Sequence, residues 1–266
     1  MQTLNLGVIQ SGLKKPLLTK QIEMNSQEKW NPTKFIIKKN KLYSSPMIGY
    51  AERVLVQHIA DFYTDAIPKY CKGILADVGC GTVPFYGFYK DYVDSVITID
   101  WENTIHPNQY VDFFEDLNQG IHSVESNSVD SVICSDVLEH IYQPMNLLNS
   151  ISDILKPGGI LLLNVPFHFY IHEIPFDYYR YTNFALEKML NDSGFEVLEC
   201  HKFGGITDAL ALFAILGTYP FHLKPLGYLM YKFSRMIKSM PIIRKHIKRS
   251  EDIITTGFGI VARKKQ

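Results

Sequence analysis

The chain has 266 residues, of which 46% are apolar, so a full hydrophobic core is feasible in one large domain or in one domain with extensions. The formal net charge is zero, and the four cysteines show no Cys-x-x-Cys pair and no metal-ligand spacing, so we expect buried thiols in a reducing compartment and no bound metal. The N-terminal residues contain no unbroken apolar stretch, which argues against a secretion signal.

The zero net charge is the sum of three blocks of the chain whose charges alternate in sign. Residues 1–50 carry a charge of +6, residues 51–208 carry −15 and residues 209–266 carry +9. An acidic central part between basic ends is typical of a protein that meets an anionic surface.

The predicted elements begin after a basic arm, residues 1–46, in which residues 38–41 are expected to form a turn or a solvated stretch. Apolar residues at helical spacing then predict a helix over 47–70. Further helices are expected at 84–91, 144–156 and 182–193, and strands at 73–78, 95–100, 110–114, 129–134, 159–165, 195–202 and 254–263. The alternation predicts an α/β domain over 47–266, with a doubly wound, mostly parallel sheet of seven strands and helices on both faces.

The most informative stretch is Asp77-Val-Gly79-Cys-Gly81 at the end of the first strand, because the next strand also ends in an acid, Asp100. The two glycines allow a sharp turn and a close approach to a ligand, and Asp100 lies where nucleotide-binding α/β folds hold ribose hydroxyls. Pro84 stands where a dinucleotide fingerprint has its third glycine, and the absence of Gly-Lys-Ser/Thr excludes a P-loop. The pattern predicts a nucleoside-like cofactor.

Three further motifs follow in order. They are Phe114-Glu-Asp116-Leu117, Val129-Asp-Ser-Val-Ile-Cys-Ser135-Asp136-Val-Leu138-Glu139-His140 and Leu155-Lys-Pro-Gly-Gly159. With the glycine turn, they resemble the class I S-adenosylmethionine-dependent methyltransferases over roughly residues 70–200. The resemblance implies a Rossmann-like sheet whose last strand is antiparallel to the rest, and S-adenosylmethionine as the cofactor. It implies cofactor contacts at Asp77, Gly79, Cys80, Gly81, Asp100, Trp101, Asp116, Leu117 and Ser135.

The parts of this cofactor match the predicted contacts chemically. Backbone N–H groups at the Gly79–Gly81 turn can meet its carboxylate, and Asp77 offers a negative charge near its ammonium group. Asp100 can accept both ribose hydroxyls. By resemblance, Asp116 accepts from the adenine amino group, with a solvated loop acid as the alternative.

The segment 166–182 after the fifth strand concentrates histidines, acids, tyrosines and one arginine. It resembles a subgroup of type 11 methyltransferases, and this resemblance implies a role in polysaccharide or glycolipid assembly. We predict His172 as the general base, because imidazole titrates near working pH; a structural histidine bonded to Asp177 or Tyr181 is the alternative. Arg180 is a candidate for an anionic substrate, with a structural pairing to Asp177 or Glu173 as the favoured alternative.

Other residues of the acceptor region have open assignments. Tyr178, Tyr179 and Tyr181 are expected to form an aromatic wall or to join the core. His168 is a weaker base candidate, and Asp136 is a modest catalytic candidate near the path of the methyl group. Glu139 and His140 are expected to be structural. No His-Glu-x-x-His motif or carboxylate cluster is present, so no metal site is predicted.

An insertion of about fifty residues, 204–252, separates the last two strands. Its first part is apolar but too short for a membrane span, which needs about 20 residues. Its second part, 224–249, has eight Lys/Arg and no acid, interleaved with apolar residues. This mixture suits a helix at an anionic membrane surface, and a lid over the active site or an oligomer contact are the alternatives.

The sequence therefore predicts a cytoplasmic methyltransferase, peripheral at the inner face of the membrane, that methylates an oxygen of a sugar or a lipid-linked glycan intermediate. The alternatives are a methyltransferase for a lipid or quinone headgroup, and a non-catalytic S-adenosylmethionine-binding protein docked on the membrane. No nucleic-acid partner is expected, because the Asn-Pro-Pro-aromatic motif of base-methylating enzymes is only partly resembled by residues 164–167. The sequence indicates no oligomeric state.

Overall fold

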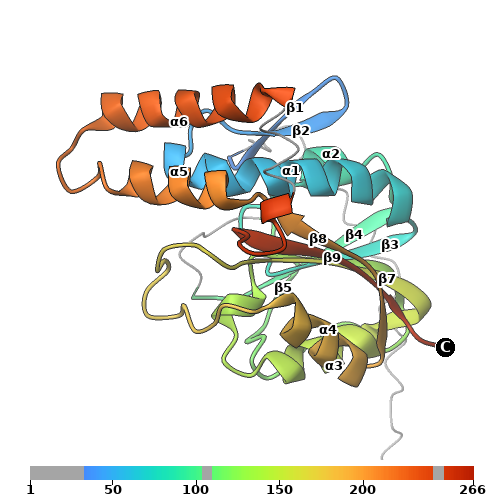
Figure 1. The fold of residues 1–266 in the computed structure, drawn as a ribbon. Helices are drawn as coiled ribbons and strands as arrows, with labels where there is room; N and C mark the ends of the chain where they lie inside the picture. The colour runs from blue at the N-terminus through green and yellow to red at the C-terminus, as the bar shows by residue number, and fades with distance from the viewer. Residues whose placement is uncertain (1–32, 104–109, 242–248) are drawn as a thin grey trace, which may run out of the picture. The chain divides into compact units, whose positions relative to one another are not determined.

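Seven strands form the central sheet in the spatial order β5-β4-β3-β6-β7-β9-β8 (Figure 1). They are β3 (Ile74–Val78), β4 (Ser95–Asp100), β5 (Phe113–Phe114), β6 (Val129–Ser135), β7 (Leu155–Pro166), β8 (Phe195–Phe203) and β9 (Gly257–Lys264). All pairs from β5 to β7 are parallel, and β9 lies antiparallel between β7 and β8. The predicted doubly wound sheet with one antiparallel strand is confirmed.

The computed structural model describes residues 33–103, 110–241 and 249–266. They lie within one unit of the chain, Asn31–Gln266. Most of the predicted basic arm and part of the basic stretch 224–249 lie outside the described residues.

Buried apolar runs explain why the central strands form where the sequence predicts them. Leu75, Ala76 and Val78 of β3 are fully buried, as is the run Leu161–Leu163 of β7, because helices cover both faces of the sheet. On one face lie α3 (Pro144–Ile154) and α4 (Asn183–Asp192), and on the other lie α1 (Tyr50–Tyr70) and the short α2 (Tyr86–Tyr89) (Figure 1).

The edge strand β5 is shorter than the predicted 110–114. The side chain of Asp112 accepts the backbone N–H of Thr98 at 2.9 Å, so a carboxylate replaces the ladder bond that a longer strand would make there. Only Phe113 and Phe114 then pair with β4.

Part of the predicted arm is a hairpin, which the sequence pattern did not predict. It consists of β1 (Phe35–Lys38) and β2 (Lys41–Ser44), joined through Lys39 and Asn40, which have φ values of +50° and +56°. Positive φ values at both residues of a two-residue loop are typical of a type I′ turn, which suits a β-hairpin. The usual sequence of such a turn is Asn-Gly. The hairpin is held by Phe35, which is buried and stacks on Phe85 at 4.7 Å between ring centroids.

The described part of the insertion includes the helices α5 (Ile206–Leu216) and α6 (Lys224–Ser239). Leu212 and Ile215 of α5 and Tyr231 of α6 are buried against Ala51 and Val54 of α1, so α5 and α6 lie against α1 on the same side of the sheet (Figure 1). Among the described helices, none combines the length and apolarity needed to cross a bilayer.

Candidate active site

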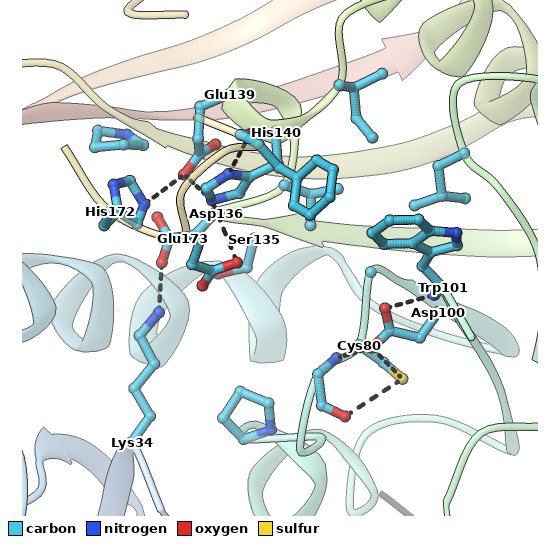
Figure 2. A pocket seen from close by; sticks show the side chains of 18 of the residues that line it. Lys34, Cys80, Asp100, Trp101, Ser135, Asp136, Glu139, His140, His172 and Glu173 are labelled. Carbon is cyan, nitrogen blue, oxygen red and sulfur yellow. Dashed lines mark hydrogen bonds and ion pairs between the residues drawn. The ribbon is translucent and has the colours of Figure 1, made fainter. Parts of the chain in front are cut away.

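A cavity of about 740 Å³ opens at the carboxyl ends of β3, β4, β6 and β7, where ligands bind in open α/β sheets. One end is lined by the glycine turn, Asp100 and Trp101, and the other by Glu139, His140 and His172 (Figure 2). The following predicted cofactor residues line it: Gly79, Cys80, Gly81, Asp100, Trp101, Asp116, Leu117 and Ser135.

The glycine turn has the conformation that the sequence requires of it. Gly79 and Gly81 have φ values of +69° and +51°, and the N–H of Gly79 donates to the carbonyl of Ile99 at 2.8 Å. A Cβ on Gly79 would lie 2.3 Å from Val137 Cγ2, whereas a Cβ on Gly81 would meet nothing within 4 Å. The turn therefore packs tightly on one side and leaves open space on the other, which fits a bound ligand that approaches the backbone.

Asp100, the last residue of β4, connects this strand to the glycine turn. Its Oδ2 accepts the N–H of Gly81 and its Oδ1 accepts the N–H of Trp101, both at 2.7 Å. The carboxylate is 93% buried in the cavity wall, since its relative exposure is 7%. Cys80 Sγ also lies 4.0 Å from Oδ2. A carboxylate only accepts hydrogen bonds, so a carboxylate in this part of the cavity wall suits ribose hydroxyls.

Asp77 lies behind the turn rather than in the lining of the cavity. Its side chain is 3% exposed and accepts a hydrogen bond from the hydroxyl of Tyr89 at 3.0 Å. Burial, with a contribution from Asp100, raises the pKa of Asp77 to about 7, while the Tyr89 hydrogen bond opposes the rise. Asp77 is thus absent from the cavity lining, and its contact with a cofactor ammonium group stays a prediction.

The acceptor side of the cavity contains an ion pair. Lys34 Nζ lies 2.5 Å from Asp136 Oδ2, and the side-chain amide of Asn164 donates to Asp136 Oδ1 at 2.6 Å. Burial lowers the pKa of Lys34, but the carboxylates of Asp136, Glu139 and Glu173 more than offset this, and the pKa is raised. Asp136 therefore lines the cavity as one partner of this ion pair.

His172 lies in the same cavity and is oriented by Asp177. The backbone N–H of His172 donates to Asp177 Oδ2 at 3.0 Å, and its Nδ1 lies 3.3 Å from the same oxygen. Burial and the neighbouring His140 lower the pKa of His172, although Asp177 opposes them. The imidazole is thus favoured in its neutral form, with Nε2 directed at Glu139 Oε1, 4.0 Å away.

Arg180 lies outside the cavity lining and pairs with Asp177. Its two terminal nitrogens donate to Asp177 Oδ1 and Oδ2 at 2.6 and 2.8 Å, and one of them also donates to the carbonyl of Tyr170 at 3.0 Å. Burial would raise the pKa of Asp177, but Arg180 and the backbone of His172 hold it at about 2. Arg180 thereby positions the loop that carries His172, which agrees with the structural alternative for this residue.

Glu139 belongs to a short 3₁₀ helix, Leu138–His140, directly after β6. Its side chain is fully buried, and burial followed by the charge of Asp136 raises its pKa well above the usual range. Its backbone carbonyl accepts the N–H groups of Tyr178 and Tyr179 at 2.9 and 3.2 Å, which fixes the segment after β7 against this turn.

The three tyrosines of that segment differ in their surroundings. Tyr178 lines the cavity, Tyr181 is buried and donates to the carbonyl of Leu138 at 3.1 Å, and Tyr179 is 40% exposed. His168 does not line the cavity, and its Nδ1 lies 2.6 Å from the carbonyl of Thr255.

Several residues that line the cavity were not predicted from the sequence. Thr33 and Lys34 belong to the predicted arm, and only the hairpin brings them to the cavity. Glu52 of α1 faces Tyr170, whose hydroxyl donates to it at 2.9 Å. Glu52 could have been predicted as a lining residue, because it is a charged residue within an otherwise apolar helical stripe. Nothing along the chain singled out Lys34.

A family profile described as "Methyltransferase domain" matches residues 57–200, which include the glycine turn, Asp77 and Asp100. The chain belongs to this methyltransferase family. The resemblance to class I S-adenosylmethionine-dependent methyltransferases is thereby confirmed, and with it the expectation of an enzyme that uses S-adenosylmethionine. The comparison with curated proteins yields no match.

Solved structures with a similar fold share little sequence with this methyltransferase. One similar structure is a chain of the complex between the Haloferax volcanii Trm112 methyltransferase activator and a methyltransferase. Its TM-score is 0.50 and its identity 15%, and the match covers 79% of this chain and 90% of that one. Phosphoethanolamine N-methyltransferase 2 of Haemonchus contortus, in complex with phosphomonomethylethanolamine and S-adenosylhomocysteine, has a TM-score of 0.48 and 18% identity, covering 79% and 53%. The [4+2]-cyclase SpnF has a TM-score of 0.49 and 20% identity, covering 79% and 83%. These likenesses concern the fold and leave the acceptor open.

Proposed function

We propose that this methyltransferase transfers the methyl group of S-adenosylmethionine to a hydroxyl oxygen of a sugar or a lipid-linked glycan intermediate. The observation that carries the proposal is the division of one cavity into two ends (Figure 2). One end has the open glycine turn and Asp100, and the other has Asp136 and His172, which suit the orientation and deprotonation of a hydroxyl.

The cofactor supplies the electrophilic methyl group on its sulfonium when it is bound. The turn from Gly79 to Gly81 and Asp100 would hold the amino-acid and ribose parts, and Asp116 with Leu117 would flank the adenine. The chain's own task is then to align the acceptor oxygen and to exclude water. In this proposal Nε2 of His172 accepts the hydroxyl proton, and the Lys34–Asp136 pair fixes the polar groups of the acceptor.

Methyl transfer from labelled S-adenosylmethionine tests this function across candidate acceptors. We expect label on the oxygen of a glycan or a lipid-linked glycan, and no transfer to amine acceptors or RNA. Transfer only to a quinone or lipid headgroup would favour the alternative acceptor class. Cofactor binding without transfer to any acceptor would favour the non-catalytic alternative, and the absence of cofactor binding by calorimetry would reject the function.

The insertion supports an acceptor at a membrane surface. Apolar side chains recur at intervals of three and four residues along α6 and at its C-cap, Met240, and are 40–61% exposed: Leu226, Leu229, Phe233, Met236 and Met240. α6 also carries Lys224, Lys232 and Arg235 and no acid, while its Lys238 pairs with Asp208 of α5. Leu210 and Phe213 of the adjacent α5 are 62% and 50% exposed.

An exposed apolar face combined with positive charge complements an anionic bilayer, so we propose that α5 and α6 dock the enzyme on such a surface. The described part of the insertion contributes no side chain to the cavity lining, which argues against the lid interpretation for that part. Docking would present a lipid-linked acceptor to the enzyme while leaving the cavity open.

Vesicle flotation gives a direct prediction for this face. Wild-type protein should float with phosphatidylglycerol-containing vesicles and less with neutral ones, and salt should weaken the binding. Replacing Leu229 and Phe233 together by Glu should reduce binding by about 10-fold or more, because two exposed side chains can no longer enter the interface. Phe184→Glu is the matched control, since Phe184 is 75% exposed on α4. Equal flotation of the double variant and the wild type would rule out docking through α6.

A further inference from the structure

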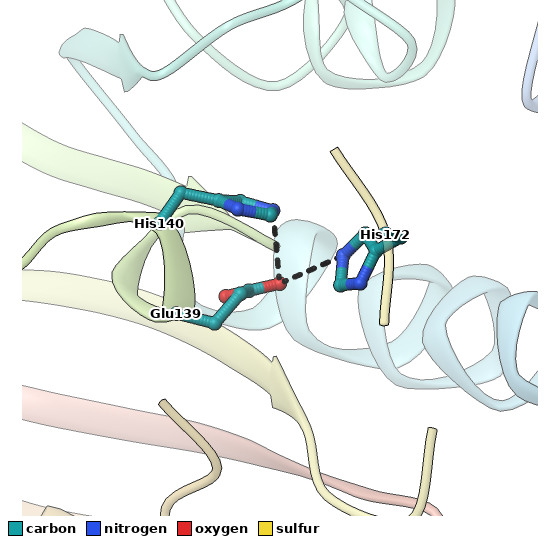
Figure 3. A group of neighbouring side chains, drawn as sticks. All are labelled: Glu139, His140 and His172. Carbon is teal, nitrogen blue, oxygen red and sulfur yellow. Dashed lines mark ion pairs between the residues drawn. The ribbon is translucent and has the colours of Figure 1, made fainter. Parts of the chain in front are cut away.

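Three potential metal ligands from two separate segments meet at one end of the cavity (Figure 3). Glu139 and His140 follow β6, and His172 follows β7. One ligand atom from each side chain lies within 4.8 Å of the other two. Nε2 of His140 and Nε2 of His172 lie 3.8 and 4.0 Å from the same atom, Glu139 Oε1. Small side-chain rotations would place all three at the distances of about 2.0–2.2 Å that a cation such as Zn²⁺ requires.

The tautomers of both histidines suit metal binding. His140 Nδ1 lies 2.9 Å from the carbonyl of Phe176, and His172 Nδ1 lies 3.2 Å from the carbonyl of Tyr170. A carbonyl only accepts, so each Nδ1 carries the proton and each Nε2 presents a lone pair. Metal-binding histidines usually donate their second nitrogen in this way, which fixes the ring and makes the other nitrogen a better ligand.

Glu139 is a buried acid that lacks a hydrogen-bond donor. Its side chain is 0% exposed, and neither carboxylate oxygen accepts a hydrogen bond from any of the described residues. The nearby cations are engaged elsewhere, because Lys34 pairs with Asp136 and Arg180 pairs with Asp177. A buried carboxylate is costly without a partner, and a cation between Glu139 and the two imidazoles would supply one.

We propose that Glu139, His140 and His172 hold a divalent transition-metal cation next to the methyl acceptor. Two imidazoles and one carboxylate suit Zn²⁺, Mn²⁺, Fe²⁺ or Co²⁺ better than Ca²⁺ or Mg²⁺. Three protein ligands leave open coordination positions towards the cavity, so the cation fits an acceptor with two neighbouring hydroxyls, as in a sugar. The role at the acceptor rests on the proposed methyl transfer, whereas the metal site itself does not.

The cation changes the predicted role of His172, since its Nε2 lone pair would bind the metal instead of a proton. Coordination lowers the pKa of the acceptor hydroxyl, and the hydroxyl proton passes to the carboxylate of Asp136. An oxygen electron pair forms the new O–C bond with the methyl carbon, while the S–C bond breaks and its electron pair stays on sulfur. The oxidation state of the cation does not change.

Direct metal binding tests the site without reference to turnover. The full chain is stripped with a chelator and titrated with Zn²⁺ by calorimetry, and Co²⁺ absorption bands report the coordination. We expect one equivalent of metal per chain. Glu139→Gln, His140→Ala and His172→Ala should each weaken binding by about 100-fold or more, since even the loss of a group that only hydrogen-bonds a ligand costs about 10- to 100-fold.

His168→Ala is the matched control, because His168 comes from the same segment but bonds to Thr255 outside the cavity. It should keep wild-type metal affinity. Melting temperatures and S-adenosylmethionine binding of all variants establish that they are folded. The absence of stoichiometric binding to the wild type, or equal binding by the three ligand variants, would overturn the metal site. Methyl transfer by metal-free protein would support the proposed function and reject a role of the metal in it. Metal binding without cofactor binding would support the metal site and reject the proposed function.

Discussion

Replacing His172 by Ala is expected to lower turnover by about 10²- to 10⁴-fold, the range typical of a lost general base. A lost metal ligand at the acceptor would act in the same direction. The affinity for S-adenosylmethionine should stay within about threefold of the wild type, a factor worth less than 1 kcal/mol. The physical reason is the arrangement of the cavity, in which His172 lies at the end opposite to Asp100 and Trp101 (Figure 2). Single-turnover transfer and calorimetry with the cofactor measure the two quantities separately.

His168→Ala is again the appropriate control, and it should retain nearly full turnover. Asp177→Asn provides an intermediate case, because it keeps the shape of the side chain but weakens the contacts that orient His172. Wild-type turnover in His172→Ala would exclude this residue from the chemistry. A parallel loss of cofactor affinity would show instead that His172 supports the cavity as a whole.

Replacing Asp100 by Ala is expected to weaken S-adenosylmethionine binding by about 100-fold or more. Hydrogen bonds to a charged group contribute about 1.5–3 kcal/mol each, and a factor of ten in affinity corresponds to about 1.4 kcal/mol. The variant removes the predicted acceptor of two ribose hydroxyls. It also frees the N–H groups of Gly81 and Trp101, which Asp100 now holds at 2.7 Å. Calorimetric titration of the folded variant with the cofactor measures the loss.

Asp112→Ala is the matched control for Asp100→Ala. Asp112 is an acid at the same edge of the sheet, but it bonds to Thr98 and does not line the cavity. The control should bind the cofactor within about threefold of the wild type, again a difference below 1 kcal/mol. If Asp100→Ala binds the cofactor as tightly as the control, Asp100 has no role at the ribose.

Local sequence determines much of the cofactor end of this methyltransferase. Gly79, Gly81 and Asp100 are close to the ends of adjacent parallel strands, and such strand ends meet at one edge of a sheet. A turn that needs positive φ also requires glycine at fixed positions. The alternation of apolar runs and helices predicted the α/β fold with a mostly parallel sheet, and the resemblance implied the antiparallel last strand. The spatial order of the strands is seen only in the structure.

The acceptor end depends on contacts between distant segments. Lys34 reaches Asp136 only because an unforeseen hairpin packs Phe35 against Phe85. Glu139 meets His172 only because backbone bonds from Tyr178 and Tyr179 fold the segment after β7 onto the turn after β6.

By itself, the sequence determined the sheet and the glycine turn, because these depend on local conformation and on the period of apolar residues. The identity of the methyl donor came from the resemblance of its motifs to the class I methyltransferases. The tertiary structure alone decided which charged groups face the acceptor, that Arg180 pairs with Asp177 behind the cavity, and that Asp77 lies behind the turn. The physical reason is that side-chain pairing across long chain separations depends on packing, and packing leaves no periodic signal along the chain.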